Sequence, residues 1–329
     1  MTGPRIVIAG TGAFAATHAE ALARQSVLTL GGFVGQSPRS GTALAARFGG
    51  RAYEAYADVL ADDAVAGIII ATPHDSHRSL GVAALHAGKP VLIEKPLGIT
   101  LDECDALIAA EQASGTRGMV GHLMRWAPAH VTARRLVAAG AIGDLVSIEG
   151  RRIIPWNAEE RRDWHKQKAT GGGMWLVQGV HVIDQMSWLA GRPITAAIGI
   201  AATRFHPGQE ADDFGAALVA MDEVTGTIRI AGTRAEVGPQ VFTELHGTLG
   251  IIKVSHRGLL MLDTGGGAKD LTDTAINHWH ANLDSEIAAF ARLVMGAAPE
   301  PDFAYGRYVL GVLEAVQRSM ESRRWESVQ

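Results

Sequence analysis

The chain has 329 residues, of which 47% are hydrophobic and 19% charged, and its formal net charge is −4. This composition supplies enough apolar material for two domains without metal or disulfide support, and it lacks the basic surplus typical of nucleic-acid-binding proteins. The single cysteine, Cys104, cannot form an intramolecular disulfide, so we expect a reducing compartment.

The N-terminal segment lacks the features of a signal peptide, because no basic stretch, long apolar core or cleavage site is present. The longest apolar runs, such as residues 64–72, have the length of a strand. A membrane span needs roughly 18 apolar residues. We therefore expect a cytoplasmic protein with no membrane partner and no nucleic-acid partner.

The first part of the chain alternates short apolar runs with stretches of helical length. The runs cover residues 6–9, 27–34, 67–71, 90–93 and 117–120. They are rich in Val, Ile and Leu and do not alternate with polar residues, as in strands covered on both faces. Between them, residues 76–87 and 101–113 predict helices, with Thr100 placed to cap the second. The pattern predicts a Rossmann domain with a doubly wound parallel sheet over residues 1–122.

The pattern changes beyond about residue 125. Helices are expected at residues 132–138, 174–189, 280–295 and 303–323, and strands at 145–154 and repeatedly between 194 and 262. Hairpin-length spacing between the later strands indicates antiparallel pairing. We therefore expect residues 123–329 to form an α/β domain with a large, mostly antiparallel open sheet.

A glycine-rich loop follows the first predicted strand and opens the first predicted helix. It contains Gly10, Gly12, Ala13 and Phe14. Glycines at this place permit a tight turn and close approach of a pyrophosphate, which the helix N-terminus then binds through its free N–H groups. We interpret these four residues as binding a dinucleotide cofactor.

The end of the second predicted strand indicates which cofactor is bound. NAD-specific sites usually carry an acid here for the ribose hydroxyls, but residues 33–40 contain none. Ser37 and Arg39 are suited to a 2′-phosphate instead. NADP(H) is therefore favoured and NAD(H) stays possible, the alternative for Arg39 being an ordinary solvated helix residue.

Several further motifs together suggest one family. They are Ile70-Ala71-Thr72-Pro73 with His77, then Glu94-Lys95-Pro96, then Gly171-Gly172-Gly173, and finally Gly179 through Asp184. With the Gly10 loop and in this order, they resemble the Gfo/Idh/MocA oxidoreductases over essentially the whole chain.

The resemblance implies hydride transfer between NAD(P) and a secondary alcohol or carbonyl of a sugar, an inositol or a cyclic diol. It implies that Lys95 and His181 are catalytic. Thr72, Pro73, His77, Glu94 and Lys95 are expected to form the wall of the cofactor site. The second domain is expected to bind the substrate and to form a homodimer or homotetramer through its sheet. The chemistry agrees, because a base must take the hydroxyl proton while a cation stabilises the oxygen.

One position departs from the family pattern. Family members commonly carry an acid four residues before the histidine, where this chain has Val177. Its loss removes a step of proton relay. Gln178 is expected to orient the ring, Asp184 to be structural, and Lys95 is an alternative principal acid or base.

The aromatic and polar stretch before the three glycines is a candidate for substrate binding. The substrate-binding residues expected there and nearby are Arg125, Trp156, Asn157, Trp164 and Gln178. The tryptophans suit stacking on a sugar ring, and the alternative is a charged surface loop with partly buried tryptophans.

No metal site is expected. His278 and His280 are two residues apart and do not share a helix face, and His74 and His77 lie in the turn assigned to the cofactor.

Two other functions stay open. One is a non-catalytic dinucleotide sensor or co-regulator, which Val177 admits but the retained Lys95 and His181 disfavour. The other is glycoside cleavage through transient oxidation, for which Asp163 or His165 would supply a second base.

Overall fold

The computed structural model describes residues 3–156, 161–234 and 238–329, and the chain forms two compact units. The first comprises Met1–His122 and Leu283–Arg307, and the second comprises Leu123–Asn282 and Tyr308–Gln329. The sequence assigned all of residues 123–329 to the second domain, whereas in the structure residues 283–307 belong to the first unit.

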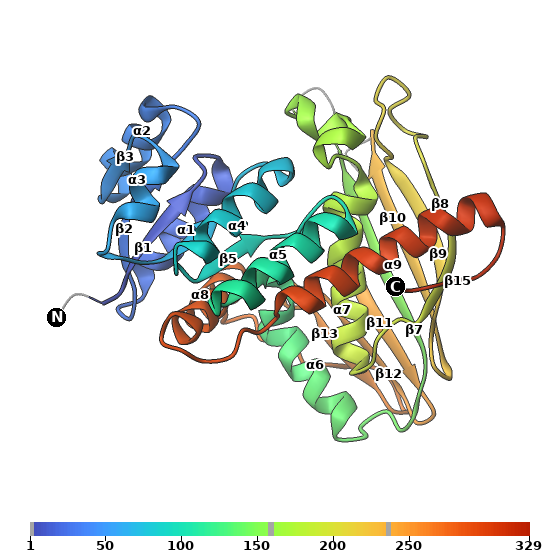
Figure 1. The fold of residues 1–329 in the computed structure, drawn as a ribbon. Helices are drawn as coiled ribbons and strands as arrows, with labels where there is room; N and C mark the ends of the chain where they lie inside the picture. Colours follow the sequence, from blue (N-terminus) through green and yellow to red (C-terminus); the bar gives the residue numbers. More distant parts are fainter. Residues whose placement is uncertain (1–2, 157–160, 235–237) are drawn as a thin grey trace. The chain divides into compact units, whose positions relative to one another are not determined.

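Six strands form the sheet of the first unit (Figure 1). They are β1 (Arg5–Ala9), β2 (Thr29–Val34), β3 (Arg51–Tyr53), β4 (Val65–Ile70), β5 (Val91–Glu94) and β6 (Gly118–Gly121). Every pairing is parallel, and the order is β3-β2-β1-β4-β5-β6. Consecutive residues Ile6, Val7 and Ile8 are all 0% exposed, so both faces of β1 are covered. This is the doubly wound order of a Rossmann domain, which confirms the predicted fold class.

The helices of the first unit follow its strands. They are α1 (Ala13–Arg24), α2 (Pro38–Phe48), α3 (Tyr56–Ala61), η1 (His74–Ser76), α4 (His77–His86) and α5 (Leu101–Ser114). Thr100 caps α5 as predicted, because its hydroxyl accepts from the amide of Glu103 at 3.3 Å. Gly115 ends the helix in the left-handed conformation, with φ of 70°.

The segment 283–307 belongs to the first unit because it contacts the edge of that sheet. It contains the second part of α8 (His278–Val294) and the start of α9 (Phe303–Ser322). The amide of Val120 donates to the carbonyl of Pro301 at 3.0 Å. The missing side chain of Gly118 leaves the space that the Phe303 ring fills. These contacts join positions about 180 residues apart, which a local sequence pattern does not show.

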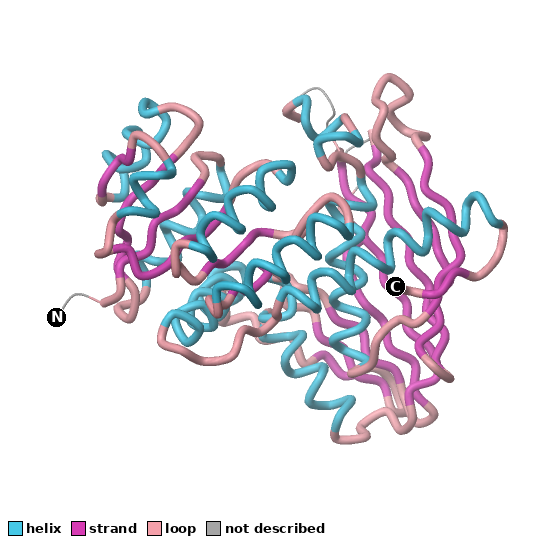
Figure 2. The backbone as a smooth tube through the Cα atoms, viewed as in Figure 1, coloured by secondary structure: helices cyan, strands magenta, loops and turns pink. Residues whose placement is uncertain are grey.

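The second unit contains a nine-stranded sheet, drawn in magenta in Figure 2. Its strands are β7 (Leu145–Pro155), β8 (Ala196–Ala202), β9 (Phe214–Met221), β10 (Val224–Thr233), β11 (Gln240–Gly247), β12 (Ile251–Val254), β13 (Leu260–Asp263), β14 (Lys269–Asp270) and β15 (Glu326–Ser327). The order is β14-β13-β12-β11-β7-β10-β9-β8-β15. Only the pairing of β7 with β10 is parallel among the described strands. The predicted large, mostly antiparallel sheet is confirmed.

Helices cover one face of this sheet. The helices of the second unit include η2 (Leu123–Trp126), α6 (Pro128–Ala138), η3 (Asp163–Lys166), η4 (Lys168–Thr170), η5 (Trp175–Gly179), α7 (Val180–Ala190) and the larger part of α9. Helix α7 lies close to the strands because Gly150 and Gly226 have no side chain where Val182 and Met186 pack. In the described part of the chain, no helix is long and apolar enough to cross a membrane.

Candidate active site

Gly10 joins β1 to α1 at the carboxyl edge of the first sheet, beside the point where the strand order reverses. Its φ is +120°, and a Cβ would collide with the carbonyl oxygen of Ala71 after β4. Its amide donates to the carbonyl of Val34 at the end of β2, at 2.8 Å. Only glycine satisfies both the conformation and the space. Open α/β sheets bind their ligands at this edge.

The N-terminus of α1 is open to an anion. Gly12 is the N-cap residue, and within the described ranges no side chain caps the helix. A Cβ built on Gly12 meets no described atom within 4 Å, and the first turn holds no acid. Free amides at a helix N-terminus bind phosphate. The loop formed by Gly10, Gly12, Ala13 and Phe14 therefore fits the pyrophosphate of a dinucleotide.

The loop between β2 and α2 lies against the Gly10 loop. A Cβ on Gly35 would lie 2.6 Å from the hydroxyl of Ser40 and 2.7 Å from a methyl carbon of Thr11. Ser37 and Arg39 are exposed, and the Ser37 hydroxyl lies 3.5 Å from that of Ser40. Ser37, Arg39 and Ser40 thus follow β2, the strand whose end contacts the 2′ position of the ribose in dinucleotide-binding folds.

The ends of β4 and β5 are tied together by His77. Its ring is 0% exposed, with Nδ1 2.9 Å from the carbonyl oxygen of Pro96 and Nε2 3.1 Å from that of Thr72. Burial lowers the pKa of His77. His77 does not reach the surface and joins the two turns through its ring, and its predicted place in the cofactor site stays a prediction. Thr72 and Pro73 are half-buried, as is Lys95, which follows β5 directly.

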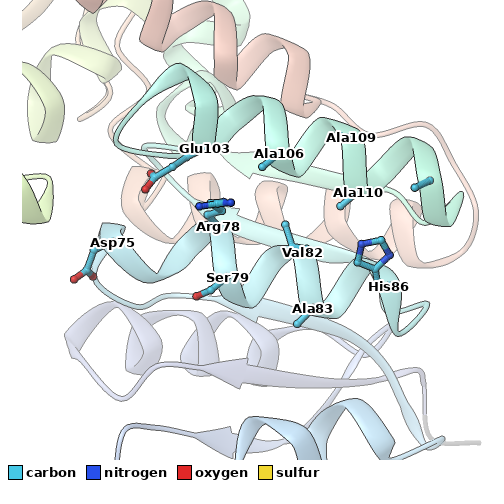
Figure 3. Close-up of a pocket in the computed structure, with 11 residues that line it drawn as sticks. Asp75, Arg78, Ser79, Val82, Ala83, His86, Glu103, Ala106, Ala109 and Ala110 are labelled. Carbon is cyan, nitrogen blue, oxygen red and sulfur yellow. The ribbon is translucent and has the colours of Figure 1, made fainter.

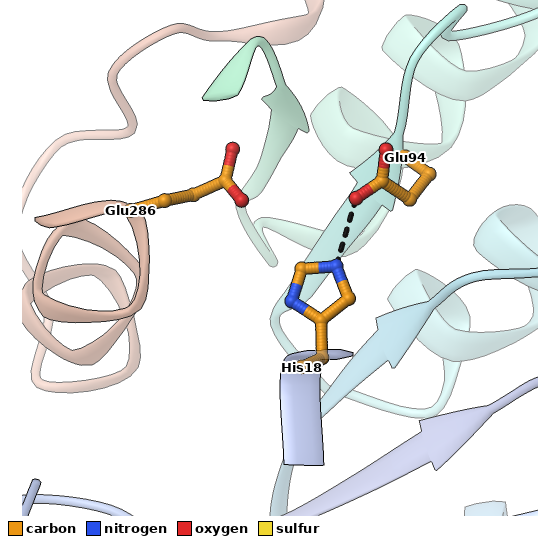
Figure 4. A group of neighbouring side chains, drawn as sticks. All are labelled: His18, Glu94 and Glu286. Carbon is orange, nitrogen blue, oxygen red and sulfur yellow. Dashed lines mark hydrogen bonds and ion pairs between the residues drawn. The ribbon is translucent and has the colours of Figure 1, made fainter. Parts of the chain in front are cut away.

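Glu94 takes part in a buried cluster that the sequence did not predict (Figure 4). Nε2 of His18 in α1 forms a hydrogen bond with Oε1 of Glu94 at 2.8 Å. Glu286 of α8 is the third member of the cluster. One ligand atom from each of the three residues lies within 4.8 Å of the others, so the group could hold a cation. The expectation of no metal therefore stays a prediction. Glu286 is 192 positions beyond Glu94, and no local pattern joins the two.

His181 belongs to a helical run that starts at Met174 and continues through η5 into α7. The expected helix at 174–189 is present, but η5 is a π-turn. Gly179 permits this, because a Cβ there would lie 2.5 Å from the Trp175 ring. His181 and Val177 are 6% and 5% exposed. The wider π-turn changes which positions face His181, so the spacing of four residues does not by itself place Val177 beside the imidazole.

Asp212 fixes the start of this run. Its Oδ2 accepts from the amide of Trp175 at 2.8 Å, and its own carbonyl accepts from the amide of Met174 at 2.8 Å. Burial raises the pKa of Asp212 to about 6. The sequence analysis did not identify this residue, which lies 38 positions after Met174.

Gln178 is held by a buried arginine. Arg152 of β7, 8% exposed, donates from Nε to Gln178 Oε1 and from Nη1 to the sulfur of Met124 at 3.4 Å. Gln178, predicted to bind substrate, therefore has its oxygen engaged within the second unit. Arg152 is a further polar residue beside this helical run that the sequence analysis missed.

Comparison with known proteins decides the family. A model described as an oxidoreductase family with an NAD-binding Rossmann fold, Gfo/Idh/MocA, matches residues 4–122. A Gfo/Idh/MocA C-terminal domain model matches residues 130–253. The chain belongs to the Gfo/Idh/MocA family of oxidoreductases.

Proteins similar to this chain include dehydrogenases named for an inositol and for levoglucosan. The uncharacterized oxidoreductase YdgJ of Escherichia coli (strain K12) is 33% identical over 147 residues, which is 45% of this chain and 42% of that protein. Inositol 2-dehydrogenase 1 of Saccharopolyspora erythraea is 27% identical to this chain. The match covers 96% of this chain and 94% of that protein. The structure of levoglucosan dehydrogenase in complex with NADH and levoglucosan superposes with a TM-score of 0.90 over 99% of both chains, at 22% identity. That likeness shows the shared fold.

In this member of the Gfo/Idh/MocA family, Arg125 forms a buried ion pair. Its guanidinium donates from Nε and Nη2 to Asp184 Oδ1, and the two side chains are 4% and 0% exposed. The predicted contact of Arg125 with substrate stays a prediction, and in the structure its charge is buried and paired. Asp184 has the structural role expected for it.

The two described tryptophans of the candidate substrate stretch are covered by their own neighbours. Trp156 is 0% exposed, with the Arg161 guanidinium 3.9 Å from its ring centre. Trp156 therefore exposes no ring face in the described structure, and its predicted role in substrate binding stays a prediction. Trp164 is half-buried, with its ring stacked on His165 at 3.5 Å. Asn157 lies outside the described residues.

A groove of about 690 Å³ runs along α4 and α5 (Figure 3). Alanines of α5 and the side chains of Arg78, Val82 and His86 line it, with Asp75 and Glu103 at one end. None of the residues that the family resemblance assigned to cofactor or substrate is among its described lining. The groove is thus separate from the Gly10 loop and from the residues after β5.

Proposed function

We propose that this oxidoreductase transfers hydride between NADP(H) and a secondary alcohol or carbonyl of a sugar, an inositol or a cyclic diol. The observation that carries the proposal is the open N-terminus of α1 at the reversal point of the sheet, with Lys95 following β5 at the same carboxyl edge. In this proposal, the dinucleotide site and the Lys95 cation share one edge of the sheet. The inositol dehydrogenase relative acts on a polyol, which supports this substrate class.

The loop formed by Gly10, Gly12, Ala13 and Phe14 would hold the pyrophosphate of the cofactor. Ser37 and Arg39 would bind a 2′-phosphate, since Arg39 is exposed in the first turn of α2 and no acid follows β2 to repel a phosphate. When bound, the nicotinamide supplies the acceptor or donor of hydride. NAD(H) is the alternative cofactor, and comparing NADPH binding with NADH binding distinguishes the two.

Lys95 and His181 perform the proton and charge chemistry in this proposal. His181 takes the hydroxyl proton when an alcohol is oxidised, because an imidazole titrates near neutral pH. The ammonium group of Lys95 stabilises the negative charge that develops on the substrate oxygen. Thr72 and Pro73 shape the wall beside Lys95, and His77 and Glu94 hold that wall from behind.

A dinucleotide sensor is the second candidate, because the side chain at the usual acid position is the buried, apolar Val177. A sensor would bind cofactor and show no turnover. Lys95 and His181 oppose this reading, since a sensor would not need their proton and charge chemistry.

The test separates the two candidates with one variant. Lys95→Met should keep NADPH binding within about threefold while kcat/KM falls at least about 100-fold, as expected for removing an electrostatic catalyst. Lys269→Met, on the exposed strand β14, is the control and should change neither quantity. A chain that binds NADPH but turns over no sugar, inositol or cyclic diol would instead favour the sensor.

A homodimer or homotetramer through the open face of the second sheet completes the proposal. Ile200 of β8 and Leu218 of β9 lie on the face opposite the helices, and they are 43% and 46% exposed. Apolar side chains on an open sheet favour association. Sedimentation equilibrium should show an oligomer that Leu218→Glu dissociates, and a monomeric unaltered chain would reject this part.

A further inference from the structure

Arg152 is a buried cation without an acidic partner. It lies on β7 opposite Val241 of β11 and Ile230 of β10, and it is 8% exposed. Its hydrogen bonds go to the amide oxygen of Gln178 and to the sulfur of Met124. Within the part of the chain that the structure describes, no Asp or Glu lies within ion-pair distance of its guanidinium.

This arrangement is energetically unfavourable unless something else compensates it. A guanidinium carries five N–H donors, and sulfur is a weak acceptor. Burial, reinforced by the charge of Arg257, lowers the pKa of Arg152 to about 10, so Arg152 is still protonated at pH 7. Removing a cation from water costs free energy that a buried counter-charge normally offsets. Arg125 of the same unit has such a counter-charge in Asp184, whereas Arg152 has none among the described residues.

The two imidazoles linked electrostatically to this site, those of His256 and His130, add no charge of their own at neutral pH. His256 is 7% exposed, and burial together with the charge of Arg152 lowers its pKa to about 3. Burial also lowers the pKa of His130, to about 4. Both rings are therefore neutral at pH 7. Arg152, His130 and His256 together therefore carry one positive charge, because the Asp184 carboxylate that acts on His130 is already paired with Arg125. A single monoanion would match that charge.

Polar atoms beside this group have spare hydrogen-bonding capacity. His256 Nδ1 and Asn282 Oδ1 have no hydrogen-bond partner among the described residues. Asn282 is 0% exposed, and its amide reaches the carbonyl of His256 at 3.5 Å. Buried polar groups are rarely left unsatisfied without a reason such as a ligand or water.

The cation is coupled to the helical run that carries His181. Gln178, which accepts from Arg152, precedes His181 by three residues in that run. Arg152 also keeps a small exposed surface, so a ligand group can reach it. A ligand group held by Arg152 would therefore lie beside the helical run that carries the proposed base.

We propose that Arg152 binds a carboxylate of the substrate, so that the substrates are polyhydroxy carboxylates such as uronic and aldonic acids. This inference rests on the proposed function, whose substrate class it narrows. A planar guanidinium binds a carboxylate through two parallel N–H···O bonds, which gives orientation as well as affinity.

Paired substrates test the proposal. D-glucuronate, D-galacturonate and D-gluconate are compared with D-glucose, D-galactose and D-glucitol, each pair differing by the carboxylate. For the carboxylate substrate that the enzyme prefers, we expect kcat/KM to be at least about 100-fold higher than for its neutral counterpart. A charge-assisted pair of hydrogen bonds to Arg152 would supply this difference. Arg152→Met should reduce that ratio to within about threefold of one. Arg151→Met is the matched control, since Arg151 is half-buried and paired with Glu149 at 2.6 Å.

A binding measurement separates this inference from the proposed function. Arg152→Met should melt at the same temperature as the unaltered chain or higher, because an unpaired buried charge is removed, whereas a purely structural role predicts a lower temperature. D-glucuronate with NADPH should raise the melting temperature of the unaltered chain and not that of Arg152→Met. Turnover of neutral sugars without preference for acids overturns the inference alone. Stabilisation by D-glucose 6-phosphate but by none of the acids assigns the site to phosphate and overturns the carboxylate. Absence of any turnover, with carboxylate stabilisation retained, rejects the enzyme and keeps the subsite.

Discussion

Arg125 and Asp184 form an ion pair inside the second unit, with side chains that are 4% and 0% exposed. The pair joins η2, which opens the unit, to α7, and Asp184 follows His181 by three residues in that helix. Its position fixes the helix that carries the proposed base. A buried pair is costly to break, because the remaining charge loses its partner in a medium of low dielectric constant.

Arg125→Met should therefore lower the free energy of unfolding by about 3–5 kcal/mol, measured by urea denaturation. Arg47→Ala is the control, because Arg47 and Glu20 form a surface pair whose side chains are 61% and 44% exposed. Its loss should cost less than about 1 kcal/mol. Equal costs for the two variants would show that burial does not determine the contribution of the Arg125–Asp184 pair.

Gly12 and Gly10 should respond differently to alanine. Gly12 has ordinary backbone angles and open space around its Cβ position, so Gly12→Ala should change the free energy of unfolding by less than about 1 kcal/mol. The added methyl group should nevertheless weaken NADPH binding at least about tenfold, because it occupies the approach to the helix N-terminus. Fluorescence titration measures the binding.

Gly10→Ala serves as the contrasting variant. Its φ of +120° and the contact with Ala71 make alanine strained, and the free energy of unfolding should fall by about 1–3 kcal/mol. NADPH binding that is unchanged in Gly12→Ala would contradict the assignment of this loop.

Arg39 determines the cofactor preference in our proposal. The unaltered chain should bind NADPH more tightly than NADH, and Arg39→Asp should weaken NADPH binding at least about tenfold, since a carboxylate replaces a cation beside the 2′-phosphate. NADH binding should change little. Arg47→Ala, near the other end of α2, should keep the preference. Tighter binding of NADH by the unaltered chain would reject the phosphate assignment and leave the oxidoreductase intact.

Asp212 makes stability depend on pH. Its pKa is about 6 in the folded chain against 3.8 for the free side chain. Between these values the unfolded chain has lost the proton while the folded chain keeps it, so the stabilising effect of this group falls as pH rises from about 4 to 6. At pH 7 the ionised Asp212 lowers the free energy of unfolding by its full amount, which is at most about 3 kcal/mol.

Asp212→Asn should remove this cost while keeping an oxygen that accepts from Trp175. The variant should be more stable than the unaltered chain at pH 7, and the difference should shrink towards pH 4. Urea denaturation across this range measures it. A difference that does not vary with pH would contradict the raised pKa.

The sequence predicted the Rossmann sheet, the cap at Thr100 and the antiparallel character of the second sheet, because each signal lies within a short segment. Strand runs buried on both faces, a hydroxyl before a helix and hairpin spacing all act through neighbours in the chain. The Gly10 loop is local in the same sense. Its tight turn between a strand and a helix is formed by a few consecutive residues.

Only the tertiary structure decided which polar residues are paired and which are not. Arg125 and Arg152 look alike in the sequence, yet one is neutralised by Asp184 and the other has no described acid beside it. Trp156 is enclosed by Arg161, and residues 283–307 join the first unit. These outcomes depend on contacts between segments distant along the chain. Hydrophobic periodicity tells which side chains are buried, but the partner of a buried charge depends on which strands and helices meet in the folded chain.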